Sequence, residues 1–174
     1  MLDKEMKKFV LNIDNISKYK YSIDIIYLLI IFSVSIIIAY NYFFLVDFHN
    51  LAAREDLHDS IIGKNAGDPY LYRILVPYLA EIFIKFLSQF IPHDIAFLLS
   101  YGIYDVIAIF LIAATLFVYL NIWFSKEYSL IGALYTLGMM PIALTDHYYQ
   151  PWSLLEVVFF TTSLLLIYKK KVCV

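Results

Sequence analysis

The sequence predicts an all-α integral membrane protein: a helical bundle of about four transmembrane helices, with one amphipathic helix in the outer interface. Hydrophobic residues make up 62% of the chain and charged residues 16%, against roughly 45–50% and about 25% in soluble domains. The mean hydropathy is +0.74. A soluble chain of 174 residues could not bury so much apolar surface, so we expect lipid to cover part of it.

The charge and the cysteine content exclude several classes of protein. The formal net charge is −2, which does not suit a nucleic-acid binder built on a basic face. The single cysteine, Cys173, can form no disulfide within the chain, so a disulfide scaffold is excluded as well. We expect the lipid bilayer as a partner and no nucleic acid.

The first 46 residues predict a surface helix followed by a first span. Over residues 1–20, lysines alternate with apolar residues at helical spacing, which is typical of a cytoplasmic amphipathic segment on a membrane. The chain then carries no charge from Ile25 to Val46. As a helix this stretch is about 33 Å long, enough for a hydrocarbon core of roughly 30 Å. We expect residues 21–174 to form one transmembrane domain.

Residues 47–94 predict an outer loop and an interfacial helix. Its apolar part, residues 71–91, carries a polar stripe at i, i+4 spacing that includes Arg73, Glu81 and Lys85. Three charged side chains in the middle of a lone lipid-facing span would each cost at least a few kcal/mol. We therefore expect this helix to lie in the interface, with a kink near Pro77 and a Glu81–Lys85 ion pair.

Three more spans are predicted at residues 95–122, 130–145 and 152–168. Asp94 is a plausible N-cap of the first of these, and Asp105 is the one charge inside it. Gly132, Gly138 and Pro141 predict tilted or kinked packing of the next span. Four spans place the N-terminal lysines, Lys126 and the lysines at 169–171 on one side, so both termini should be cytoplasmic and the protein should lie in the plasma membrane.

Several polar residues on the predicted outer face are candidates for chemistry. Asp47 stands where the first span leaves lipid, and partial desolvation of such a carboxylate suits a general base or a metal ligand. Asp146 and His147 hold a similar position after the third span. The plain alternative for all three is that they simply end a hydrophobic run. Arg73 could bind a phosphate at headgroup depth or could only snorkel toward headgroups.

The remaining polar candidates are histidines and two acids within the spans. His49, His58 and His147 could ligate a divalent cation, but their spacing is not diagnostic, so we predict no metal site and identify no cofactor. Asp105 is expected near the midplane, with no Lys or Arg in any span to pair with it. An intramembrane acid is by default a functional hypothesis, but we favour helix–helix hydrogen bonding over ion or proton transport for Asp105. Glu156 is expected to be shallower.

Two stretches carry a resemblance to a known family: residues 68–80, with Arg-x-Leu-x-Pro-x-Leu from Arg73, and residues 146–154. The first resembles a pattern that follows the first span of polytopic bacterial membrane proteins, and those are similar to the GT-C superfamily of glycosyltransferases. The resemblance implies an enzyme that transfers a sugar from a lipid-phosphate donor at the outer membrane face. It also implies that the chain corresponds to the N-terminal part of a longer protein, because the family has more than four spans.

The resemblance also implies roles for individual residues. Asp47 takes the place of the catalytic carboxylate at the outer end of the first span, with Asp59 as the second candidate. Arg73 becomes a contact for the donor phosphate, and Asp146 and His147 become further substrate contacts. Two other functions stay open: a non-enzymatic membrane subunit whose Asp105 and Glu156 meet partner helices, and a small transporter that uses Asp105.

Overall fold

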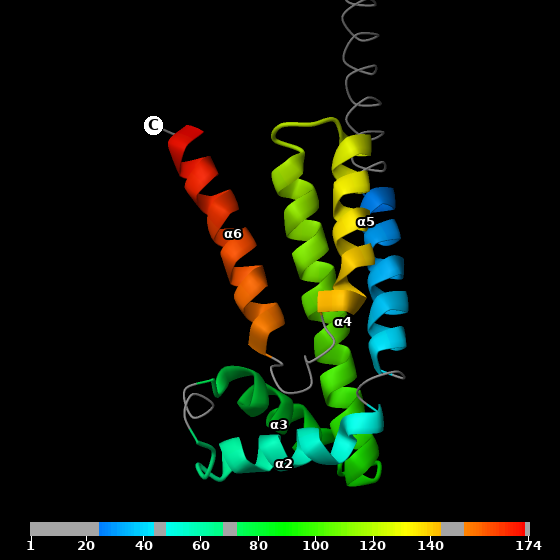
Figure 1. Cartoon of the computed structure of the whole chain (residues 1–174), viewed down its shortest axis with the longest axis vertical. Coiled ribbons are helices and arrows are strands. Elements are labelled where there is room, and N and C mark those ends of the chain that lie inside the picture. Colours follow the sequence, from blue (N-terminus) through cyan, green and yellow to red (C-terminus); the bar gives the residue numbers. More distant parts are fainter. Residues whose placement is uncertain (1–24, 44–47, 68–72, 144–151, 173–174) are drawn as a thin grey trace, which may run out of the picture.

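The computed structural model describes residues 25–43, 48–67, 73–143 and 152–172. Within these ranges the chain is an all-α bundle of six helices. Four of them stand side by side, and two lie crosswise at one end of the four (Figure 1). The predicted segment 1–20 and the predicted site residues Asp47, Asp146 and His147 lie outside the described residues.

The upright layer contains an N-terminal helix, Ile25–Tyr42, and the helices α4 (His93–Leu120), α5 (Lys126–Ala143) and α6 (Trp152–Val172). They run in alternating directions, so the start of the N-terminal helix and the end of α6 lie at the same end of the layer (Figure 1). The predicted helices are confirmed to within a few residues, except that α6 continues through the three lysines.

The crosswise layer contains α2 (Leu51–Ile62), preceded by the short 3-10 helix η2 (Phe48–Asn50), and α3 (Leu75–Leu87). We expected a single interfacial helix in this region, and α2 was not predicted. The reason lies in its buried face, which is formed by Arg54, His58 and Ile61. These residues have helical spacing, but two of the three are charged or titratable, so a search for apolar periodicity passes over them.

Helix α4 connects the two layers because it is the longest described helix, with 28 residues, or about 42 Å. Its residues Phe97 and Tyr101 belong to a core shared with α2, α3 and the start of α6. Ala108 to Phe117 belong to a second core shared with the N-terminal helix, α5 and α6. Asp105 therefore lies at the junction between the layers, beside Arg54 of α2, and its expected depth near the membrane midplane stays a prediction.

Two helix starts differ from the sequence expectation. Helix α3 begins at Leu75, which places Pro77 in its first turn, where a backbone N–H has no intrahelical acceptor. Pro77 therefore breaks no helical hydrogen bond, and the kink expected near it has no cause. Asp94 is not an N-cap: α4 begins at His93 after Pro92, and Asp94 stands in the first turn, where its charge faces the positive end of the helix dipole.

Polar and small residues fix the packing of the upright helices. The hydroxyl of Tyr27 donates to Glu127 Oε1 at 3.3 Å, joining the N-terminal helix to α5. Thr115 and Thr161 share a hydrogen bond of 2.9 Å between α4 and α6. Gly132 on α5 lies so close to α4 that a Cβ atom there would stand 2.6 Å from a methyl carbon of Leu120. Small residues allow such close approach of two helices.

Candidate functional site

The buried charged or titratable residues of the described chain, Arg54, His58 and Asp105, lie where α2 meets α3 and α4. Arg54 and His58 are four residues apart, so they occupy one face of α2, and each is only 3% exposed. The Arg54 guanidinium lies 3.9 Å from the carboxylate of Asp105 and 4.2 Å from the centre of the Tyr101 ring. Asp105 thus has a cationic neighbour, and it comes from the crosswise layer.

His58 links three helices through both of its ring nitrogens. Its Nδ1 is 2.9 Å from the Tyr101 hydroxyl on α4, and its Nε2 is 3.1 Å from Glu81 Oε2 on α3. The other oxygen of Glu81 is 2.9 Å from Lys85 Nζ, which confirms the predicted i, i+4 ion pair. Since both nitrogens of His58 already have protein partners, it is not available as a metal ligand in this arrangement.

These contacts lower the pKa of the Glu81 carboxyl. Burial raises its pKa, but the hydrogen bonds and positive charges of Lys85 and His58 outweigh burial, so the pKa of Glu81 lies below its ordinary value. Chemically, carboxylate, imidazole and phenol form a relay of the kind that moves protons. The imidazole and phenol are almost fully buried, so the relay has no room for a substrate and its contribution is to join helices.

A second polar site lies at the start of α3, facing α6. The guanidinium carbon of Arg73 stands 5.2 Å from the centre of the Trp152 ring. Both residues line a cavity of about 230 Å³ whose other walls include Val76, Leu155 and Phe159 and whose lining also contains Glu156. The structure thus brings together two of the predicted residues, Arg73 and Glu156. Asp59 is exposed on α2 and is not among the residues that line this cavity.

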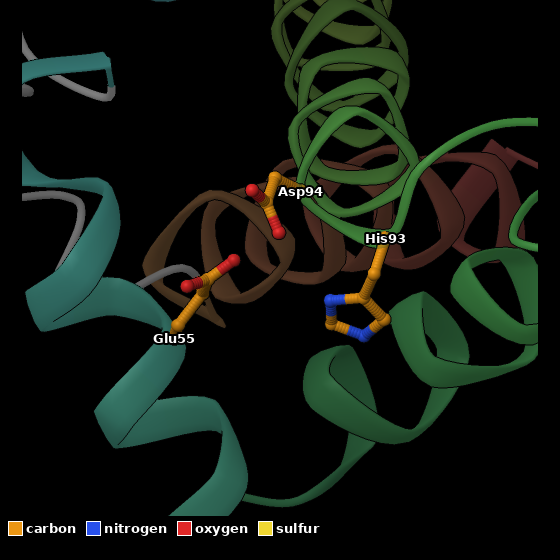
Figure 2. A group of neighbouring side chains, drawn as sticks. All are labelled: Glu55, His93 and Asp94. Carbon is orange, nitrogen blue, oxygen red and sulfur yellow. The ribbon is translucent and has the colours of Figure 1, made fainter.

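A third cluster joins α2 to the start of α4. Figure 2 shows Glu55 on α2 and Asp94 on α4 with their carboxylates facing each other, and His93 beside them. One ligand atom from each residue lies within 4.8 Å of the other two. The sequence reasoning missed this group because Glu55 is separated from His93 by almost forty residues; no spacing motif can show such a pair.

The histidines considered from the sequence as possible metal ligands do not form a cluster with one another among the described residues. His49 lies on η2, where its ring contacts Phe48, His58 is held by Tyr101 and Glu81, and His147 lies outside the described ranges. Comparison of the chain with protein-family models, with curated proteins and with solved structures finds no match.

Proposed function

We propose that the chain is a multi-span membrane protein that binds a phosphate-bearing lipid at the junction of its two layers. Two helices, Ile25–Tyr42 and α4, are long and apolar enough to cross a membrane. A core helix of a soluble protein is mostly buried, whereas the most apolar windows of these two helices are only 22% and 33% buried. This exposure supports lipid as their surroundings.

The outer surface of the upright layer supports the same proposal. Each of its four helices exposes large apolar side chains, for instance Ile37, Ile107, Ile142 and Phe160, which are 58%, 51%, 71% and 65% exposed. A soluble monomer rarely exposes apolar surface so continuously, because it would aggregate. With α5 and α6 added, four spans leave α2 and α3 together on one side, which the lysine distribution makes the outer side.

The cavity beside Arg73 carries the lipid-binding part of the proposal. Arginine offers a planar fork that suits phosphate oxygens, and the neighbouring walls of Leu155 and Phe159 are apolar. A phosphate at the mouth of the cavity and a hydrocarbon chain along α6 would satisfy both kinds of surface. The single observation behind the proposal is this pairing of one arginine with apolar walls at the end of an apolar helix.

The reaction we propose for this site is sugar transfer from a polyprenyl-phosphate donor. An acceptor hydroxyl would attack the anomeric carbon, the bond from that carbon to the phosphate oxygen would break, and the hydroxyl proton would pass to Asp47. Arg73 would stabilise the charge that develops on the leaving phosphate. A shared outer site for Asp47, after the first span, and Arg73, before α3, is what the family resemblance implies.

Trp152 offers a direct test because its ring lies against Arg73. We would replace Trp123 by Phe, so that Trp152 is the one remaining tryptophan, and titrate the protein in nanodiscs with undecaprenyl phosphate. We expect a saturable change in Trp152 emission that is lost in Arg73→Gln and kept in Lys85→Gln, a control that removes an exposed cation of α3. An unchanged emission, or an equal response of Arg73→Gln, would contradict lipid-phosphate binding at Arg73.

The transporter alternative finds less support in the geometry. A carboxylate that carries ions or protons must exchange them with a water-filled path. Asp105 is 2% exposed and has Arg54 beside it, an arrangement that favours a fixed structural role. Loss of proton-coupled uptake in Asp105→Asn would be required to restore the transporter hypothesis.

A further inference from the structure

We propose that Glu55, His93 and Asp94 form a binding site for one divalent transition-metal ion of the zinc type, which ties α2 to the start of α4. This inference is independent of lipid binding at Arg73, because the two groups of residues share no member. The sequence predicted no metal site, and the histidines considered there as possible ligands were His49, His58 and His147.

The geometry of the three side chains suits a shared ion. Ligand atoms that bind one ion at about 2.0–2.2 Å lie at most about 4.4 Å apart, and the three candidate atoms already lie within 4.8 Å of one another. His93 and Asp94 are exposed, so small rotations of their side chains can close the difference. Figure 2 shows the carboxylates of Glu55 and Asp94 directed at each other and the His93 ring beside them.

A second observation points to a missing cation. The Oε1 atom of Glu55 is sealed from solvent and accepts no hydrogen bond from the described part of the chain. A carboxylate oxygen that is shielded from water and has no hydrogen-bond donor is unfavourable, because its lost hydration is not replaced. A metal ion between Glu55 and Asp94 would satisfy this oxygen and would also cancel the repulsion between the two carboxylates.

The charges around Glu55 act in the same direction. Asp56 and Asp59 stand on the same helix as Glu55, and Asp94 adds a further carboxylate from α4. The site is therefore a negative one that attracts either a proton or a cation. An imidazole nitrogen with two carboxylates favours Zn²⁺ or Mn²⁺ over Mg²⁺ and Ca²⁺, which take oxygen ligands, and water would complete the coordination.

To test this, the purified full chain in detergent micelles would first be stripped of metal with a chelator. It would then be titrated with Zn²⁺, and binding would be measured by calorimetry. We expect the unaltered chain to bind one Zn²⁺ ion saturably. In Glu55→Gln and in His93→Asn the dissociation constant should be at least about tenfold higher. The matched control is Asp56→Asn, which removes an exposed carboxylate of the same helix and should stay within about twofold. Cys173→Ser should likewise leave binding unchanged, which excludes the thiol as a ligand.

His93→Asn keeps the test valid if Glu55→Gln does not fold, because His93 is exposed. Absence of saturable Zn²⁺ binding by the unaltered chain would overturn the proposal and would leave a shared proton between Glu55 and Asp94 as the compensating charge. Equal affinity of the unaltered chain and His93→Asn would overturn it as well.

Discussion

The guanidinium of Arg54 on α2 lies 3.9 Å from the carboxylate of Asp105 on α4, and the two side chains are 3% and 2% exposed. This pair spans the junction between the crosswise and the upright helices. It explains how an acid is tolerated inside an otherwise apolar helix, and it makes the position of α2 depend on α4. The Arg54 guanidinium also covers the ring of Tyr101, so one side chain of α2 contacts two successive turns of α4.

Replacing one member of the Arg54–Asp105 pair should lower the free energy of unfolding more than replacing both. Arg54→Met leaves the buried Asp105 charge without its partner, and we expect a loss of about 3–5 kcal/mol in the free energy of unfolding. The double variant Arg54→Met, Asp105→Leu should recover part of that loss. Thermal unfolding in detergent micelles, arranged as a double-mutant cycle, measures the coupling. Additive effects of the two substitutions would show that the pair is not coupled.

The Glu81 carboxylate should make the docking of α2 sensitive to acid. Its pKa in the folded chain lies below the ordinary value of 4.5, so the folded state binds fewer protons than the unfolded state. The resulting stabilisation is present above about pH 4.5 and is lost as the pH falls toward the lower folded pKa. We expect the melting temperature of the unaltered chain to approach that of Glu81→Gln as the pH is lowered from about 6 to 3. A constant difference over this range would argue against the ion pair and hydrogen bonds assigned to Glu81.

The sequence predicted the upright helices well because lipid-length apolar runs leave a strong and local signal. The Glu81–Lys85 pair was likewise predictable, since helical spacing determines it. Helix α2 and the partner of Asp105 were not predictable. Arg54 lies more than fifty residues before Asp105 in the sequence, and its burial depends on tertiary packing between two helices whose directions differ.

For the site residues, too, the sequence showed what is local and missed what depends on contacts between helices. Arg73 and Glu156 were recognised as candidates one by one, but their presence in a common cavity depends on how α3 meets α6. Glu55, His93 and Asp94 carry no motif spacing, and only the contact of α2 with the start of α4 brings them together. At Pro77 and Asp94 the error was smaller and came from the position of a helix start. Pro77 lies in the first turn of α3 and causes no kink, and Asp94 lies in the first turn of α4 and is not its N-cap.

The contact between α4 and α5 at Gly132 can be tested with a matched pair of glycines. A Cβ atom at Gly132 would stand 2.6 Å from Leu120 Cδ1, whereas one at Gly138 would meet nothing within 4 Å. We expect Gly132→Val to cost about 1–3 kcal/mol of unfolding free energy through overpacking. Gly138→Val should stay within about 1 kcal/mol of the unaltered chain, because valine has a higher helix propensity than glycine and the site has open space. Equal effects at the two sites, measured by thermal unfolding, would refute the close packing.

In the metal-free protein, the ionised carboxylate of Glu55 should lower the stability of the fold, and a bound metal ion should remove this effect. The folded pKa of Glu55 is raised above 4.5, so the fold binds an extra proton and loses stability as the pH rises above that value. We therefore expect Glu55→Gln, studied in the presence of a chelator near pH 7, to melt at a higher temperature than the unaltered chain. In excess Zn²⁺ the order should reverse, because the variant lacks the ligand. A lower melting temperature of the variant under both conditions would indicate a purely structural role.

Cysteine accessibility in intact cells tests most directly the central claim, that the upright helices cross the membrane and leave α2 and α3 on its outer side. In a Cys173→Ser background, single cysteines would replace Lys85 on α3, which is 73% exposed, and Tyr128 at the opposite end of the upright layer, which is 70% exposed. We predict that a membrane-impermeant thiol reagent labels Lys85→Cys in intact cells and Tyr128→Cys only after permeabilisation. Labelling of both positions in intact cells, or of neither before permeabilisation, would place them on the same side and contradict the account.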